Sequence, residues 1–281
     1  MFRSPPRTVN CKASAADTSA QFLTSAVLRS WRGLLGLTAE LLAPPHCYLC
    51  QGPGQALPAP WGLDLCGHCH QACPQLPPAC PRCGLPASTP LAQVRPPASG
   101  QHCADCTVRP PPYDAVFAAF AYDPPVDELV RDLKFHGALA PGRILGLLLA
   151  AQRRASGLPL PDLVIPMPLH RDRLVSRGFN QATLIASVAA RQLQLPLRPR
   201  LLQRVRATAP QSGLSAGARQ HNMQGAFVAR PLAGLGPVAL VDDVLTTGST
   251  ATAAARALKA AGASRVEVWV AARALPSAPV C

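Results

Sequence analysis

The chain has 281 residues, a formal net charge of +13 and 48% hydrophobic residues, with 32 Pro and 20 Gly. This hydrophobic content supports a packed core and excludes a wholly disordered protein, and the length suits one full domain with a small accessory unit. No apolar stretch approaches the roughly 20 residues that span a bilayer. Since the first basic residues are also followed by no apolar export signal, we expect a soluble cytoplasmic protein without a membrane span.

The positive charge favours polyanionic partners such as nucleic acid, phosphorylated metabolites or anionic lipid. The arginines are scattered along the chain rather than grouped in runs. Solubility, or a genome composition that favours Arg and Ala, explains the same charge equally well. Both interpretations stay open at the level of composition.

The first part of the chain is rich in proline and predicts few regular elements. Residues 1–21 show no periodicity and are predicted to form a disordered leader. Residues 22–42 carry apolar side chains at roughly helical spacing, and the two prolines at 44–45 end the predicted helix. Together with the cysteine-rich segment, this helix forms a predicted N-terminal unit over residues 22–109, and residues 110–112 form a stiff linker.

Eight of the 11 cysteines form four pairs, each with the two-residue gap of a zinc knuckle. Taken in chain order, the pairs make two sets of four thiols, and each set can surround one tetrahedral zinc ion. The two sets are Cys47, Cys50, Cys66 and Cys69, followed by Cys80, Cys83, Cys103 and Cys106. The spacing between knuckles is that of a zinc ribbon, so the sequence predicts one or two structural Zn²⁺ ions.

A disulfide framework is the alternative, and the missing export signal argues against it because the cytosol keeps thiols reduced. His68, His70 and Cys73 lie beside the second knuckle and can replace a ligand there. The segment is poor in large apolar residues, so metal would supply the stability that its core cannot. Sites made only of thiolates are closed, which excludes catalysis by zinc, while contact with nucleic acid or protein stays open.

Strands alternate with helices in the predicted second domain, residues 113–275. The predicted strands cover residues 115–122, 163–167, 201–205, 237–241 and 266–272. The predicted helices cover residues 126–134, 142–154, 181–194 and 250–261. This alternation predicts an α/β domain in which helices flank a parallel sheet.

The segment from Val238 to Thr250 is the most informative in the chain. An apolar strand is followed by two acids, Asp242 and Asp243, and then by a short loop before the next helix. The loop residues are Thr246, Thr247, Gly248, Ser249 and Thr250. Loop amides, hydroxyls and the helix N-terminus can surround a phosphate, and carboxylates at the end of a strand can hold a ribose diol or Mg²⁺. An ordinary capped strand-turn-helix would explain Thr250 but not the paired acids.

This stretch resembles the phosphoribosyl pyrophosphate (PRPP) binding motif of type I phosphoribosyltransferases. With the four knuckles before it, the chain resembles the ComF family of competence-associated proteins over residues 22–274. Three further segments support the resemblance: residues 133–137 (Leu-Lys-Phe-His-Gly), residues 166–181 and residues 211–227. The resemblance implies a type I phosphoribosyltransferase-like sheet preceded by a small zinc-ribbon domain.

The resemblance also implies roles for basic side chains around the pyrophosphate of PRPP. The candidates are Lys134, Arg173, Arg177 and Arg219, with Arg171, Arg206 and Gln211 as further possibilities. It implies that Asp242 and Asp243 act at the catalytic centre together with Mg²⁺. For Gly178, Phe179 and Asn180 the alternative to a role in ligand binding is a structural one, in which they cap the following helix.

Two functions follow from these patterns. The first is a phosphoribosyltransferase that transfers the phosphoribosyl group to an acceptor that the sequence does not reveal. The second is a non-catalytic protein of natural transformation that binds PRPP or a nucleotide together with single-stranded DNA. Competence or DNA-processing proteins would be its partners, although 5% aromatic residues argues against a broad base-stacking platform. A zinc-ribbon protein with a decayed pocket is disfavoured by the intact acids and loop.

Overall fold

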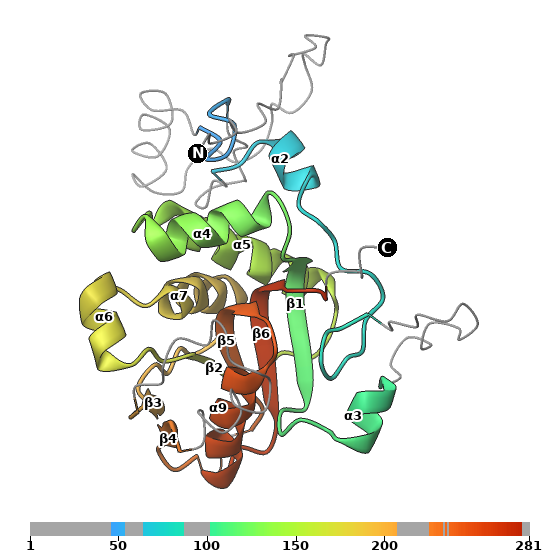
Figure 1. Ribbon diagram of the computed structural model, residues 1–281, viewed down its shortest axis with the longest axis vertical. Coiled ribbons are helices and arrows are strands. Elements are labelled where there is room, and N and C mark those ends of the chain that lie inside the picture. Colours follow the sequence, from blue (N-terminus) through green and yellow to red (C-terminus); the bar gives the residue numbers. More distant parts are fainter. Residues whose placement is uncertain are drawn as a thin grey trace, which may run out of the picture. The chain divides into compact units, whose positions relative to one another are not determined.

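The computed structural model describes residues 46–53, 64–86, 102–206, 225–232, 234 and 236–276 (Figure 1). The chain divides into two compact units, Met1–Ala72 and Cys73–Cys281. The predicted leader and the helix over residues 22–42 lie outside the described residues. The domain boundaries placed at residues 109 and 113 stay a prediction. In the described part of the chain, no helix has the length and apolarity needed to cross a membrane.

The described part of the first unit is a short cysteine-containing turn followed by the helix α2 (Gly67–Gln71). The turn is closed by an antiparallel bridge between His46 and Pro53. The amide of Tyr48 donates to the carbonyl of Asp64 (2.8 Å), which joins the turn to the segment that leads into α2. This small unit therefore holds together through backbone hydrogen bonds around its cysteines.

The second unit contains a sheet of four parallel strands. Its order across the sheet is β1 (Ala115–Ala121), β6 (Val266–Arg273), β5 (Val238–Leu245) and β2 (Leu163–Pro166). The strands consist mostly of Val, Ala, Leu and Ile. β2, β5 and β6 are largely buried, as expected for a parallel sheet covered on both faces, whereas the first four residues of the edge strand β1 are half-buried. The predicted α/β fold class, a parallel sheet flanked by helices, is confirmed.

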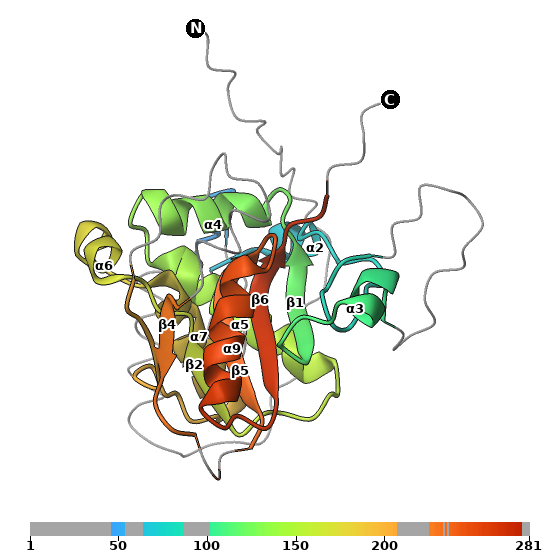
Figure 2. The same ribbon diagram turned by 60° about the horizontal axis from the view of Figure 1, so that its bottom comes forward.

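Helices cover the two faces of this sheet (Figures 1 and 2). One face is covered by α5 (Ala140–Ala155) and α7 (Gln181–Leu193), and α4 (Val126–Phe135) packs on α5. The other face is covered by α9 (Ser249–Ala260), whose buried alanines face the core. An antiparallel pair of short strands, β3 (Leu202–Arg204) and β4 (Phe227–Ala229), packs beside α9.

Most predicted element boundaries shift by only one or two residues in the structure. The largest shift is at the end of β5: the strand predicted to end at residue 241 continues to Leu245, because β6 extends to Arg273 and keeps pairing with β5 through both acids. The segment after β2, for which no helix was predicted, forms the helix α6 (Arg171–Arg177). This helix buries none of its residues, so it lacks the apolar periodicity by which helices are predicted.

The second unit also includes the cysteine-containing segment that precedes β1. The amides of Val116 and Ala121 on β1 donate to the carbonyls of Pro81 and Pro74, each at 2.9 Å. This segment therefore runs along the outer edge of β1. The helix α3 (Ala104–Val108) completes the second cysteine group before the chain enters the sheet.

Candidate functional site

The predicted phosphate loop joins the carboxyl end of β5 to the amino end of α9. Gly248 has a left-handed backbone with φ +79°, and a Cβ at this position would lie 3.0 Å from the Tyr113 hydroxyl. The hydroxyls of Thr247 and Ser249 hydrogen-bond at 2.8 Å. The amide of Thr252 donates to the carbonyl of Gly248 (2.8 Å), so the earlier amides of the helix face the loop. The loop has the glycine, hydroxyls and helix N-terminus that an anion site needs.

Asp242 and Asp243 lie in β5, where the neighbouring strand β2 has already ended. Pro166, the last residue of β2, pairs with Val241, while Asp242 still pairs with Val270 on the other side. Open α/β sheets place ligands outside the carboxyl ends of their strands. The two acids therefore occupy the position predicted for a ligand site.

The two carboxylates have different surroundings. The carboxylate of Asp243, a residue only 8% exposed, accepts from the Val244 amide (2.6 Å) and pairs with Lys134 Nζ at 2.9 Å. Loss of solvent and the adjacent charge of Asp243 raise the pKa of Asp242 from 3.8 to about 7. Lys134 and Arg204 oppose this rise. Asp242 therefore changes its charge close to neutral pH.

Basic side chains from three elements surround these acids. Lys134 lies in α4, Arg173 and Arg177 lie in α6, and Arg204 ends β3. Burial lowers the pKa of Arg177, opposed by the charge of Asp243 and assisted by that of Arg173. Burial and Arg173 likewise lower the pKa of Arg204, opposed by Asp242. Lys134, Arg177 and Arg204 thus act on the two carboxylates, and Arg173 lies near both of the other arginines.

Most of the residues predicted for the site lie together around the end of β5. Arg219 is the exception, because it lies outside the described residues, as does Gln211. Arg204 was not singled out from the sequence, since a lone Arg in a three-residue strand has no motif around it. Asn180 caps α7 by accepting from the Ala182 amide (3.0 Å), which confirms the interpretation of this residue as a helix cap.

A cavity of about 750 Å³ lies next to this group of charges. It is lined mainly by apolar side chains from the end of β2, from α7 and from β3, with Arg171, Arg200 and Arg204 among them. The site thus combines an anion loop, an acidic pair and an adjoining apolar space.

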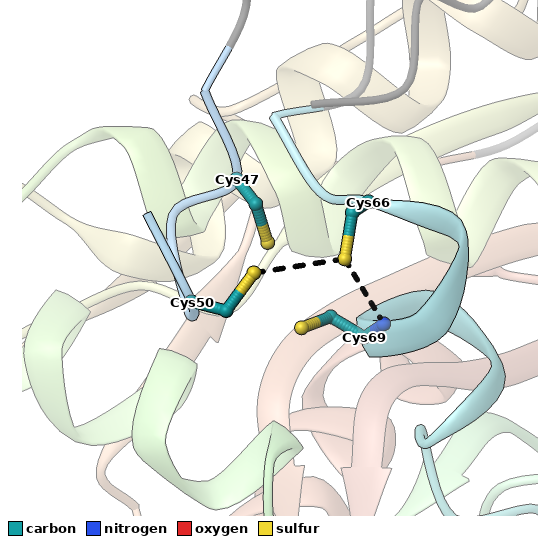
Figure 3. A group of neighbouring side chains, drawn as sticks. All are labelled: Cys47, Cys50, Cys66 and Cys69. Carbon is teal, nitrogen blue, oxygen red and sulfur yellow. Dashed lines mark hydrogen bonds between the residues drawn. The ribbon is translucent and has the colours of Figure 1, made fainter. Parts of the chain in front are cut away.

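The eight predicted cysteine ligands form two compact groups, and Figure 3 shows the first of them. Within each group the four Sγ atoms lie within 4.8 Å of one another. The Cys50–Cys66 and Cys83–Cys103 Sγ distances are 3.7 and 3.8 Å, and no disulfide joins any of the described cysteines. Cys73 is buried but belongs to neither group. The predicted grouping in chain order is therefore the one that the structure brings together.

Each of the two groups fits one tetrahedral metal ion. Four thiols at this spacing form the donor set that zinc prefers in structural sites. Burial opposes ionisation of Cys47 and Cys80, but backbone amides around each sulfur lower the pKa of both thiols to about 7. The paired carboxylates of the sheet offer the oxygen ligands that Mg²⁺ prefers. Each set of residues thus fits the metal predicted for it.

The parallel sheet flanked by helices and the two groups of four cysteines define an α/β protein with two candidate structural metal sites. No protein-family profile matches the chain. It is 39% identical to the DNA utilization protein YhgH of Salmonella typhi over 240 residues, 84% of this chain and all of the relative. It is 35% identical to competence protein F of Haemophilus influenzae over 181 residues, 62% of this chain and 79% of the relative. The chain belongs to the ComF family.

Among solved structures, the chain is similar to UMP synthase of Leishmania donovani. The match has 20% sequence identity and a TM-score of 0.29, and it covers 50% of this chain and 24% of the synthase chain.

Proposed function

We propose that the chain binds PRPP with Mg²⁺ at the carboxyl end of β5 and transfers the phosphoribosyl group to an acceptor. The observation that carries this proposal is that three cations, Lys134, Arg177 and Arg204, act on the two acids of β5, with Arg173 close to both arginines. A ligand with many negative charges and a ribose suits this mixture of cations and carboxylates better than a neutral ligand does. The adjacent loop adds a site for the 5′-phosphate.

Each part of the site has a task in this reaction. The Thr247 and Ser249 hydroxyls and the first amides of α9 hold the 5′-phosphate. The carboxylates hold the ribose diol, and Mg²⁺ would add positive charge between ribose and pyrophosphate. As the bond at C1 breaks, negative charge grows on the pyrophosphate, where Lys134 and the arginines stabilise it. The apolar cavity beside Arg204 has room for the acceptor.

Turnover of PRPP is the direct test of this proposal. Pyrophosphate release is followed after the protein is mixed with Mg²⁺, PRPP and pooled bases and amines, and release that needs an acceptor supports a transferase. The double variant Asp242→Asn with Asp243→Asn should abolish PRPP binding. Asp162→Asn is the matched control, because Asp162 accepts from the Gly236 amide (3.1 Å) at the other end of the sheet. Binding by the double variant at wild-type affinity would contradict the assignment.

A second function is favoured by the comparisons and by the charge. Relatives named for DNA utilization and for competence, together with a net charge of +13, support a PRPP-binding protein that also handles single-stranded DNA during DNA uptake. In that case PRPP binds without turnover. The logarithm of the affinity for single-stranded DNA should then fall linearly with the logarithm of the salt concentration. Structural zinc in both cysteine groups would stabilise the protein.

A further inference from the structure

Arg273, the last residue of β6, is a buried arginine outside the group of cations described above. It is only 4% exposed, and a buried guanidinium is costly unless its donors are satisfied. Its Nη1 donates to the carbonyls of Leu245 (2.6 Å), Ala274 (2.9 Å) and Thr246, and its Nε donates to the carbonyl of Cys83 (3.0 Å). One planar group thus contacts two separate segments of the chain.

The first of these segments is the metal-binding turn of the second cysteine group. Cys83 is one of the four thiols, and the next residue, Gly84, has φ +69°. A Cβ at Gly84 would lie 3.5 Å from Arg273 Cδ and 2.9 Å from Val116 Cγ1. The turn therefore packs against the aliphatic part of the Arg273 side chain and against β1.

The second segment is the start of the phosphate loop. Leu245 ends β5 and Thr246 begins the loop, so the bonds from Arg273 fix the point at which the chain leaves the sheet. Tyr113 also borders this loop, because its hydroxyl limits the space at Gly248. Two residues before Tyr113, the carbonyl of Pro111 accepts from Arg82 Nη2 (2.9 Å), and Arg82 lies in the metal-binding turn. Two routes thus join the second cysteine group to the loop.

We propose that Arg273 is a positioning residue that couples metal binding at the second cysteine group to PRPP binding at the loop. This inference rests on the proposed PRPP site. When the four thiolates hold an ion, the Cys83 carbonyl is fixed, and through Arg273 the carbonyls of Leu245 and Thr246 are fixed as well. Only a guanidinium presents donors in several directions within one plane, so lysine cannot replace it.

The first experiment compares PRPP affinity among full-length variants with measured zinc content. In calorimetry with Mg²⁺, Arg273→Gln and Arg273→Lys should bind PRPP about tenfold more weakly than wild type, as is typical for coupled sites. Arg153→Gln is the control, because Arg153 is also buried, at 1% exposure, and donates to the carbonyls of Leu158 and Pro159, which belong neither to the loop nor to a cysteine group. It should lower stability and leave the affinity for PRPP unchanged.

The second experiment uses reciprocity, because coupling requires that each ligand strengthen the binding of the other. PRPP should slow the release of one zinc ion to a chelator from wild-type protein and should not slow it from the Arg273→Lys variant. Equal release rates with and without PRPP in wild type overturn the coupling, even if the Arg273 variants fail to fold. Wild-type affinity in a folded Arg273→Gln variant overturns it too. If wild type binds no PRPP, the proposed function fails together with this inference.

Discussion

The two cysteine groups repeat one local structure. In both, the amide of the first cysteine donates to a carbonyl five residues ahead, Cys47 to Gly52 (2.7 Å) and Cys80 to Leu85 (2.9 Å). In both, the third cysteine is the N-cap of a five-residue helix, α2 or α3. Amides from equivalent positions lower the pKa of the first thiol in each group. The backbone and the sulfur ligands are therefore alike.

The groups differ at the residue that follows the second cysteine. Both positions have a left-handed backbone, with φ 60° at Gln51 and +69° at Gly84. Gln51 is exposed, whereas a side chain at Gly84 would meet Val116 and Arg273. The same turn therefore occurs once with an exposed residue after the second cysteine and once packed against the strands of the sheet domain. The surroundings of the turn, rather than its ligands, make this difference.

Loss of a thiol should separate the two groups most strongly. Cys83→Ser removes a ligand from the group that contacts the phosphate loop through Arg273, so it should destabilise the sheet domain by several kcal/mol and weaken PRPP binding about tenfold. Cys50→Ser should also release one zinc ion but keep PRPP binding. Zinc content, thermal unfolding and calorimetry measure these effects. Equal loss of PRPP binding in both variants would contradict the comparison.

A methyl group at Gly84 tests the seating of the second turn directly. Gly84→Ala combines a left-handed alanine with a contact of 2.9 Å to Val116, and should cost about 2–4 kcal/mol of unfolding free energy. Denaturant unfolding measures the loss. Gly137→Ala is the control, since it has φ +66° but no atom within 4 Å of its Cβ position. A similar loss in both would show that backbone strain alone is responsible.

A change at the acids should alter stability without disturbing either cysteine group. Because the pKa of Asp242 is raised to about 7 in the folded chain, its contribution to stability is present at low pH and is lost as pH rises through 7. Asp242→Asn should therefore stabilise the ligand-free protein by an amount on the order of 1 kcal/mol at about pH 8, and by less at about pH 5.5. Thermal unfolding at the two pH values, with zinc content unchanged, checks this. A gain that is larger at the lower pH would contradict the assigned shift.

The smallest effect is expected at the exposed counterpart of Gly84. Gln51→Gly relieves a left-handed glutamine but loses its hydrogen bond to the Tyr48 carbonyl (2.9 Å) and makes the unfolded chain more flexible. These effects nearly cancel, so stability should change by less than about 0.5 kcal/mol. Denaturant unfolding of the full chain measures the change, and a large loss would mean that the first turn is packed as tightly as the second.

Much of this architecture could be predicted from the sequence because its signals are local. Alternating apolar runs predicted the four strands and the helices α4, α5, α7 and α9 to within a few residues. Cysteine spacing predicted the composition of both groups. The acids and the loop after Val241 could be predicted to lie together at the carboxyl end of a strand, because a single continuous segment holds them.

The rest depends on contacts between distant residues. Arg273 and Cys83 are 190 positions apart, and an arginine at the end of an apolar strand gives no sign of its partners. Arg204 lies near the acids only because the strand that holds it, β3, packs beside α9. The short polar helix α6 has no buried face from which to predict it. Such features come from tertiary packing, which overrides local propensity.

The hydrogen bonds from Val116 and Ala121 to the cysteine-containing segment have a consequence for behaviour in solution. An uncovered outer strand is a template on which another chain can add. Zinc starvation should loosen this segment and expose β1 while the remainder of the sheet stays folded. We therefore expect chelator treatment to cause concentration-dependent self-association, visible by light scattering, before secondary structure is lost.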